Sequence, residues 1–331
     1  MEKIKIGITH GYTNGVGYEV ILKAFEEPTL LEMCTPIVYG SPKVASYHRK
    51  SMGLTTNFAT IQKAEDAQDG RLNLMECIQD EVKVELGQKT PEADNATTIS
   101  IEAARRDYAE KCFDAQVMAP GDDIAESDGL TLLINERMKI AFVTDQQPMN
   151  EVGKNITEEL LTAKLEALDK VLKRDFAISG PRIAVLALNP EPGHEEEEIL
   201  KPVIAKASEK HILAMGPLSA ESIFGTEAYS HYDAILALYH DQGYVPFKLL
   251  TSDFAVKLHI SGDALTSAPV QDAELAKAGK GEANITSFCN AIYTVTDILR
   301  NRQDYDEAHA NPLPKLFHDK REDNRRSAPA E

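Results

Sequence analysis

The chain is 331 residues long, 43% hydrophobic and strongly acidic, with a formal net charge of −18. Its length is typical of two domains, and its apolar content is ample for sizeable cores. The negative charge argues against general nucleic-acid binding, because phosphate backbones are held mainly by lysine and arginine. A small phosphate remains compatible with an acidic chain, since it needs only a local cluster of donors.

The sequence also indicates a cellular compartment. Residues 1–6 pass at once into a strand-like alternation, and no apolar run approaches 18 residues. The four cysteines are widely scattered, without a CxxC pair or the spacing of a zinc cage, and are expected to be reduced thiols. We therefore expect a cytoplasmic protein without membrane or nucleic-acid partners.

Strands and helices are predicted to alternate along the chain, which is typical of α/β folds with a parallel sheet. Strands are predicted at residues 4–9, 36–40, 115–119, 140–144, 182–188, 234–239 and about 256–260. Helices are predicted at residues 19–25, 42–50, 96–112, 157–174, 195–210 and 286–300, with Thr97 or Thr98 as a cap of the third. The stretch between residues 51 and 95 is less regular, and the polar tail at 311–331 is expected to be partly disordered.

The most informative motif is an apolar strand that breaks off in a polar run. Residues 234–239 lead directly into His240, Asp241, Gln242 and Gly243, and Lys248 follows. Ligands of parallel α/β sheets collect beyond the carboxyl ends of strands, which makes His240 a candidate metal ligand and Lys248 a candidate phosphate ligand. The alternative is that His240 is a hydrogen-bonded structural residue, as lone histidines often are.

Two other strand ends are candidate ligand sites. The loop at residues 9–19 contains Gly11, Gly15 and Gly17, whose spacing suits either a close approach to a ligand or a tight βα turn. The loop at residues 188–194 carries a carboxylate and an imidazole, or simply leads into a helix. Most of the acidic run at residues 195–198 is expected to be solvated and to complement the helix dipole.

Taken together, these strand ends resemble the NAD-dependent 4-hydroxythreonine-4-phosphate dehydrogenases of pyridoxal phosphate biosynthesis. The similarity runs from about Ile4 to Arg302. The Tyr-His-Asp-Gln-Gly run of that family, followed by a substrate lysine, is matched in sequence and spacing by residues 239–243 and Lys248. The family's Thr, Gly, Gly-Ile-Gly and Glu pattern is similar to the run from Thr9 to Glu19.

The resemblance implies a two-domain fold like that of isocitrate and isopropylmalate dehydrogenases, with parallel or mixed sheets flanked by helices. We expect residues 1–120 plus 290–325 to form one domain and residues 121–289 to form the other, on the metal and substrate side. The implied reaction oxidises the secondary alcohol of a small phosphorylated substrate with NAD and then decarboxylates it, using a divalent metal within a homodimer. Gly279 and Gly281 match the family's cofactor-binding segment.

The chain departs from the family at the metal site. Of the three metal-binding histidines in the family, only His240 is present, and Gln146 and Glu191 stand at the other two positions. Glu191, Asp145 or Asp241 could supply carboxylate oxygens instead. Such a set of ligands would favour magnesium or manganese over zinc.

The substrate contacts of the family are also altered. The Gly-His-Thr-Glu segment expected after Pro120 is missing, and the family's substrate asparagine and arginine correspond to Lys257 and Leu265. The Asp-His-Gly-Thr loop near the cofactor reads as residues 269–272 with a different sequence. Only Lys248 is retained among these contacts.

Three hypotheses follow. The first is an active dehydrogenase that uses His240, Lys248 and a substitute carboxylate. The second is a catalytically impaired paralogue that keeps the dimeric fold and a nucleotide or phosphate site, because the departures lie at strand ends while the framework strands remain similar to the family. The third, a phosphate acyltransferase of similar architecture, gains no support from residues 239–248.

Overall fold

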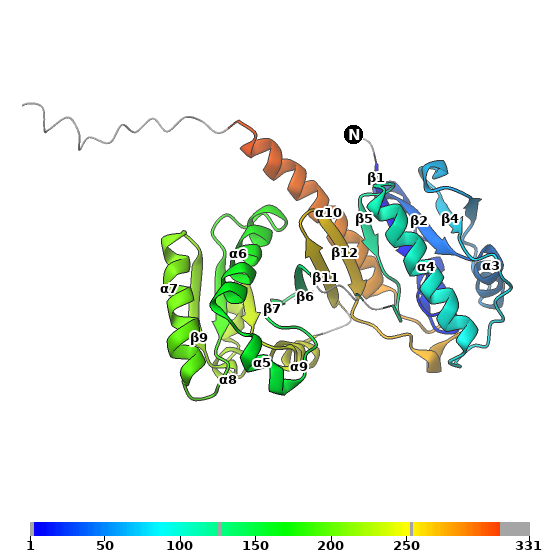
Figure 1. Cartoon of the computed structure of the whole chain (residues 1–331). Helices are drawn as coiled ribbons and strands as arrows, with labels where there is room; N and C mark the ends of the chain where they lie inside the picture. The colour runs from blue at the N-terminus through cyan, green and yellow to red at the C-terminus, as the bar shows by residue number, and fades with distance from the viewer. Residues whose placement is uncertain (1–2, 123, 125–127, 252–253, 312–331) are drawn as a thin grey trace, which may run out of the picture.

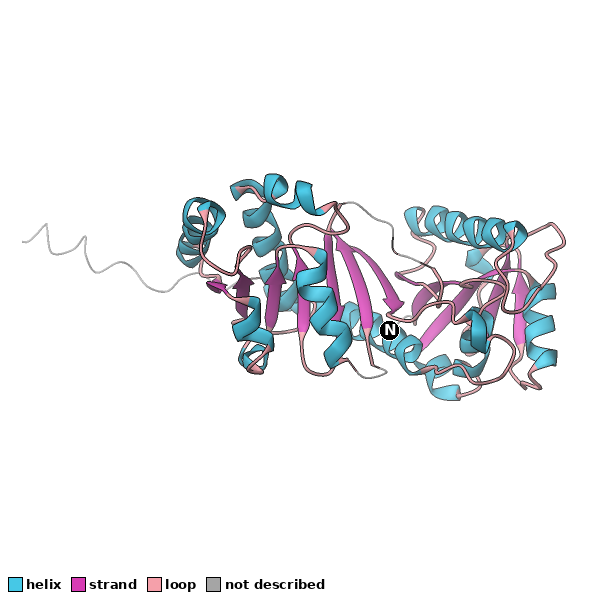
Figure 2. Cartoon of the chain, turned by 90° about the horizontal axis from the view of Figure 1, so that it is seen from below, coloured by secondary structure: helices cyan, strands magenta, loops and turns pink. Residues whose placement is uncertain are grey.

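The computed structural model describes residues 3–122, 124, 128–251 and 254–311. It confirms the predicted α/β class: one twelve-stranded mixed sheet runs through the molecule, and helices cover both of its faces (Figures 1 and 2). The strand order is β3-β4-β2-β1-β5-β12-β11-β6-β7-β10-β8-β9. The predicted division into two domains stays a prediction.

The strands are β1 (Ile4–Thr9), β2 (Cys34–Gly40), β3 (Phe58–Ile61), β4 (Leu72–Glu76), β5 (Ala115–Val117), β6 (Leu130–Ile134), β7 (Lys139–Phe142), β8 (Arg182–Leu186), β9 (Leu213–Leu218), β10 (Ala234–Ala237), β11 (Val256–Ser261) and β12 (Ala264–Pro269). The α-helices are α1 (Gly17–Ala24), α2 (Pro28–Met33), α3 (Pro42–Ser51), α4 (Pro91–Ala109), α5 (Met149–Asn155), α6 (Glu158–Arg174), α7 (Lys201–Glu209), α8 (Ala220–Phe224), α9 (His240–Leu250) and α10 (Thr286–His309).

Most neighbouring strands pair in parallel, but the strand pairs at the centre of the sheet are antiparallel. Strand β11 pairs in antiparallel fashion with both β12 and β6, and β6 does so with β7. Strand β12 returns to parallel pairing beside β5. Helix α10 packs over β11 and β12 and also contacts α1 and α6, so it joins elements from both halves of the sheet (Figure 1).

The apolar pattern explains how these elements pack. The inner strands, such as β1 and β10, are almost wholly buried because helices cover both faces of the sheet. Helix α6 buries Leu161, Leu165, Leu168 and Leu172 at intervals of three and four residues, and Thr157 caps it by accepting a hydrogen bond from the Leu160 amide. None of the described helices is long and apolar enough to cross a membrane.

Several predicted boundaries were wrong. The stretch between residues 51 and 95 contains β3 and β4, whose short runs at the end of the sheet give a weak periodic signal. Helix α4 begins at Pro91 with Thr90 as its cap, so neither Thr97 nor Thr98 caps it. Helix α10 continues past its predicted end at residue 300 to His309. Its last turns are largely exposed to solvent, so they lack the apolar periodicity on which the prediction relied. The predicted disorder of the tail concerns residues 312–331, which lie outside the described residues.

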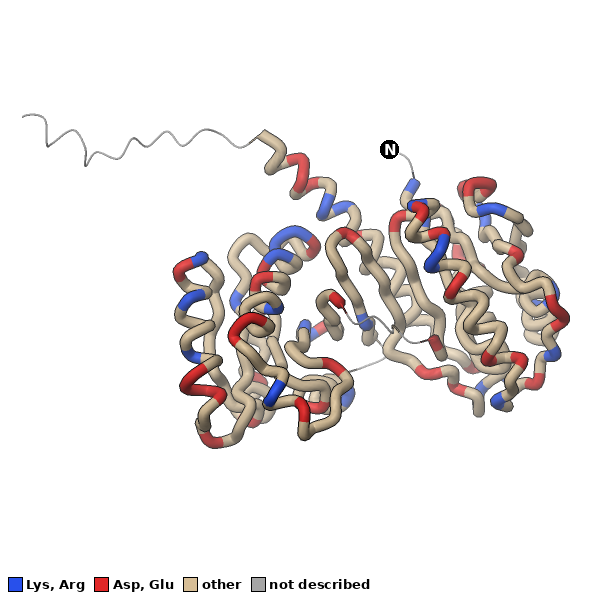
Figure 3. Tube along the Cα trace, viewed as in Figure 1, with Lys and Arg blue, Asp and Glu red and all other residues tan. Residues whose placement is uncertain are grey.

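The surface charge is mixed as well as negative. Lysines and arginines are interspersed with aspartates and glutamates along most elements in the view of Figure 3. Many exposed lysines pair with carboxylates on the same or a neighbouring helix, as Lys201 does with Glu197. Such exposed pairs contribute little to stability.

Candidate active site

Helix α9 starts at His240 and carries the two principal candidate residues on one face. His240 directly follows β10 and its cap residue Tyr239. Its ring stacks on Tyr244, with 4.6 Å between the ring centroids, and the Lys248 ammonium lies 5.7 Å from the centroid of the same Tyr244 ring. Residues four apart on a helix are neighbours, so positions 240, 244 and 248 form a continuous row.

This row borders a cavity of about 1030 Å³. The cavity is lined by His240, Tyr244 and Lys248 from α9, by Gln146 and Lys257, by residues 268–275, and by Tyr12, Lys89, Asp94, Thr97, Thr98, Gly121 and Asp122 from the first part of the chain. The structure therefore brings together the strand-end run, the position of the first family histidine and the altered cofactor loop. A cavity of this size is sufficient for a small ligand.

Of the other candidate metal ligands, only Asp241 contacts His240 directly. Asp241 is exposed, and its carboxylate lies 2.8 Å from the His240 Nδ1 atom. Asp145 lines an adjacent cavity of about 480 Å³, whereas Glu191 is exposed on the loop after β8. Within the described ranges no three His, Cys, Asp or Glu side chains are grouped closely enough to hold a metal ion. The assignment of these four residues to a metal stays a prediction.

The glycine loop at residues 10–17 is a tightly packed turn. Gly11 has a φ of +73°, and a Cβ atom there would lie 2.4 Å from the Pro120 carbonyl oxygen. A Cβ atom at Gly17 would lie 2.2 Å from the His10 carbonyl oxygen. These contacts account for both glycines by close packing of the backbone, which supports the βα-turn interpretation of the motif.

The glycine loop also packs against the candidate cofactor segment. The Val16 amide donates to the Ala273 carbonyl at 3.0 Å. Gly279 and Gly281 both adopt positive φ, and the Gly281 carbonyl accepts a hydrogen bond from Lys23 at 2.6 Å. Helix α1 thus holds the backbone at Gly281, while the role of both glycines in binding a cofactor stays a prediction.

The loop after β8 is organised by one buried carboxylate. Glu196 is fully buried and accepts hydrogen bonds from the Asn189 amide at 2.8 Å and the Gly193 amide at 2.7 Å. Burial alone would raise the pKa of Glu196, but these hydrogen bonds outweigh it and lower that pKa below its ordinary value. Glu196 is therefore a buried exception in a run whose residues Glu197 and Glu198 are exposed, and it holds the loop in shape.

Asp122 is a cavity residue that the sequence analysis did not select. It follows β5 by a few residues and accepts hydrogen bonds from the Thr9 hydroxyl and, at 3.1 Å, from the Gly11 amide. Burial raises the pKa of Asp122 from 3.8 to about 7, although both hydrogen bonds oppose the shift. Its position at the carboxyl end of a strand was the available signal, because side chains there face the ligand side of the sheet.

We expect Asp122→Asn to change how stability depends on pH. Because the pKa of Asp122 is higher in the folded protein than in the unfolded chain, ionisation of its carboxyl group destabilises the folded state. The folded protein therefore loses stability as the pH rises from the unfolded pKa, about 4, to the folded pKa, about 7. Asparagine keeps an oxygen that can accept from Thr9 and Gly11 but cannot ionise. The variant should be more stable than the wild type by roughly 1–3 kcal/mol at pH 8 and similar to it near pH 4.

Urea unfolding between pH 4 and 8 would measure this difference. The exposed substitution Asp304→Asn is the matched control, because its carboxylate is in solvent and should not change the slope. Parallel stability curves for Asp122→Asn and the wild type would contradict the expectation.

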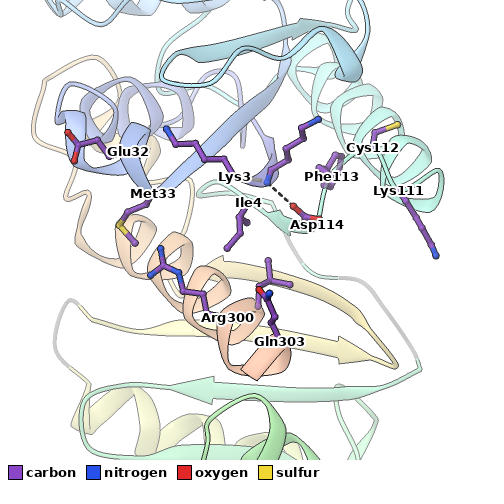
Figure 4. Close-up of a pocket in the computed structure, with 12 residues that line it drawn as sticks. Lys3, Ile4, Glu32, Met33, Lys111, Cys112, Phe113, Asp114, Arg300 and Gln303 are labelled. Atoms are coloured by element: carbon purple, nitrogen blue, oxygen red, sulfur yellow. Dashed lines mark hydrogen bonds between the residues drawn. The ribbon is translucent and has the colours of Figure 1, made fainter. Parts of the chain in front are cut away.

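A further cavity of about 590 Å³ lies at the amino ends of β1 and β5, away from this site (Figure 4). Its polar groups serve local structure: the Lys3 ammonium donates to the Leu31 carbonyl at 2.8 Å, and Asp114 accepts from the Lys5 amide at 2.8 Å. Figure 4 shows Lys3 and Lys111 pointing in different directions. Their ammonium groups do not converge on one position.

Comparison with solved structures defines the class of protein first. The chain has the fold of the 4-hydroxythreonine-4-phosphate dehydrogenases: the enzyme of that name from Klebsiella pneumoniae superposes with a TM-score of 0.74 at 22% identity, covering 90% of this chain and 98% of that one. The likeness also confirms the predicted α/β fold class.

Comparison of sequences gives the family itself. Residues 121–295 match the family model described as pyridoxal phosphate biosynthetic protein PdxA. The 4-hydroxythreonine-4-phosphate dehydrogenase of Bacteroides thetaiotaomicron is 42% identical over 349 aligned residues, which cover 97% of this chain and 96% of the relative. The enzyme of the same name from Sulfurihydrogenibium is 28% identical and covers 91% of this chain and all of the relative. The chain belongs to the PdxA family.

Proposed function

We propose that this chain is an NAD-dependent 4-hydroxythreonine-4-phosphate dehydrogenase that acts in pyridoxal phosphate biosynthesis, in the cytoplasm and as a homodimer. The observation that carries the proposal is the row of His240, Tyr244 and Lys248 along one wall of the large cavity. The cavity reaches from the strand ends of one half of the sheet to the glycine loop of the other. Membership of the PdxA family supports the choice of reaction.

Lys248 supplies the charge that such a substrate requires. Its ammonium donates to the Val270 carbonyl at 3.2 Å, which fixes the end of a flexible side chain at the cavity wall. A lysine held in this way can bind a phosphate as a compact point charge. His240, which lies on the same face of α9 beyond Tyr244, would then face the carbon atoms next to the phosphate.

The residues near the cofactor loop fit a ligand that donates hydrogen bonds. The side-chain oxygen of Gln271, on the cavity wall, is buried and has no partner among the described residues. A bound NAD supplies a hydride acceptor, and its amide or amino groups are donors that Gln271 could accept from. With NAD bound, the alcohol carbon would lose a hydride to the cofactor and its hydroxyl proton to solvent. The resulting β-keto acid would lose carbon dioxide, and the carbon left behind would take up a proton from water.

A divalent metal finds less support in these residues than NAD does. Because the described part of the chain holds no group of three candidate ligands, its own residues do not form a complete metal site. His240 with a substitute carboxylate from Asp145, Asp241 or Glu191 remains the proposed set, for magnesium or manganese. The absence of two family histidines is what keeps an impaired paralogue as the competing proposal.

A turnover assay separates the two proposals. Purified protein should reduce NAD in the presence of 4-phosphooxy-L-threonine and magnesium or manganese, and His240→Ala should lose most of that rate. The double substitution Gln146→His and Glu191→His restores the family's residues and serves as a positive control for the assay. An inactive wild type beside an active restored variant would establish the impaired paralogue instead.

A further inference from the structure

Asp122 lies where the wall of the large cavity meets the candidate cofactor segment. It lines this cavity, as Lys248 does. The preceding residue, Gly121, packs so closely on residues 269–275 that a Cβ atom there would lie 2.9 Å from the Cβ atom of Ala273. Lys248 donates a hydrogen bond to a carbonyl of the same segment. Asp122 and Lys248 therefore border this segment from two distant parts of the chain.

One oxygen of the Asp122 carboxylate is occupied and the other is not. Oδ2 accepts hydrogen bonds from the Thr9 hydroxyl and, at 3.1 Å, from the Gly11 amide. Oδ1 is buried and has no hydrogen-bond partner among the described residues. Buried acceptors are nearly always satisfied in folded proteins, and the cavity is where a ligand could bring the donor that Oδ1 lacks.

The other carboxylates that line the described part of this cavity are less suited to receive a proton. Asp94 and Asp272 are exposed, so water solvates them. Glu274 is half-buried, but its carboxylate pairs with the Lys277 ammonium at 2.9 Å. Among the described lining residues, Asp122 is thus the carboxylate that has a buried oxygen without a partner.

No cation pairs with Asp122 among the described residues. Burial lowers the pKa of His10 to about 4 and raises the pKa values of Tyr12 and Tyr18, so these three neighbours are neutral at pH 7. Lys89, which also lines the cavity, is exposed to solvent. Burial therefore decides the ionisation of Asp122 and raises its pKa to about 7, so that its acid and base forms are both populated at neutral pH.

We propose that Asp122 is the general base that takes the hydroxyl proton of the substrate. As the alcohol carbon loses its hydride to NAD, the O–H bond breaks, its proton passes to Oδ1 of Asp122, and the electron pair of that bond forms the carbonyl. The protonated carboxyl group then passes the proton to solvent, which restores the carboxylate for the next turnover. The inference rests on the proposed function and adds a catalytic residue to it.

Asp122→Asn separates catalysis from structure. The amide keeps an oxygen for the hydrogen bonds of the glycine loop but cannot take a proton, so kcat/KM should fall about 10²- to 10⁴-fold. The wild-type value should rise as the pH passes the pKa of Asp122, about 7, because the base must be ionised, and the variant should lose this rise. Because the variant should also be more stable at pH 8, unfolding would not explain its loss of rate. Asp304→Asn, on the exposed face of α10, is the matched control and should keep the rate and its pH dependence.

A small carboxylic acid should replace the missing group in Asp122→Ala. Formate can enter the space left by the side chain and accept the proton, so it should raise the rate of this variant roughly tenfold or more in proportion to its concentration. It should leave Asp122→Asn unchanged, because the amide still fills that space. A residue that only holds the glycine loop in shape would not be replaced by formate.

Binding gives a readout that does not depend on turnover. Isothermal titration calorimetry without cofactor would compare 4-phosphooxy-L-threonine with O-phospho-L-homoserine, which has the same skeleton but lacks the reacting hydroxyl. At pH 8 the wild type should bind the hydroxylated compound about 10- to 100-fold more tightly, as expected for a hydrogen bond to a charged group. Asp122→Ala should lose this preference, and thermal melting shows whether each variant is folded.

The results distinguish the base from the reaction itself. If the wild type oxidises the substrate and Asp122→Asn keeps its rate or its pH dependence, another group is the base and the proposed function stands. Equal binding of the two compounds by the wild type, together with no rescue by formate, would leave Asp122 as a structural residue of the glycine loop. If the folded wild type does not oxidise the substrate, the proposed function fails and the assignment of the base fails with it.

Discussion

Lys248→Met should reduce kcat/KM for 4-phosphooxy-L-threonine about 10- to 100-fold, mainly by raising KM. The substitution keeps the length of the side chain and its packing on Tyr244 but removes the ammonium. Hydrogen bonds to charged groups are worth about 1.5–3 kcal/mol, which corresponds to that range. Because the phosphate is remote from the reacting carbon, the loss should affect ground state and transition state alike.

Initial-rate kinetics with NAD in excess would measure this effect. Lys201→Met, which removes an exposed lysine paired with Glu197 on α7, is the matched control and should behave like the wild type. Lys248→Arg keeps the charge and should recover part of the lost efficiency. A fall in kcat with an unchanged KM would place Lys248 at the reacting atoms instead.

The fold was largely predictable because its signals are local. The buried strands β1, β2, β7, β8 and β10 are short apolar runs that follow polar loops, and such runs can be recognised without neighbours. The central antiparallel pairs were not predicted. The order of β12, β11 and β6 depends on which strands meet in space, and a sequence pattern of period two does not specify this.

The candidate site was predictable only in part. His240 and Lys248 were selected from the end of a strand and from the spacing of a family motif, and both line the large cavity because they share one face of α9. The start of α9 at His240 was missed because Gly243 and Pro246 lie within its short sequence and favour a loop. Asp122 was missed because its buried environment forms where segments distant in sequence meet.

Arg302→Met should destabilise the protein by about 3–5 kcal/mol. The Arg302 guanidinium donates to both carboxylate oxygens of Asp175 at 2.8 Å and to the Asp263 carbonyl at 2.7 Å. The side chains of Arg302 and Asp175 are only 7% and 2% exposed. Removing the cation would leave a buried carboxylate without its partner, which is the costly case for a buried ion pair.

This ion pair joins α10 to the end of α6, so its loss should also loosen the contact of α10 with the centre of the sheet. Replacing both partners, as Arg302→Met with Asp175→Leu, removes the unpaired charge and should recover much of the loss. Arg300→Met removes a half-exposed arginine that lies 3.9 Å from Asp297 and should cost less than about 1 kcal/mol. Urea unfolding of the three variants would measure how much of the loss comes from leaving Asp175 buried without a partner. A double variant no more stable than Arg302→Met alone would show that the hydrogen bond to Asp263, and not the buried charge, dominates the contact.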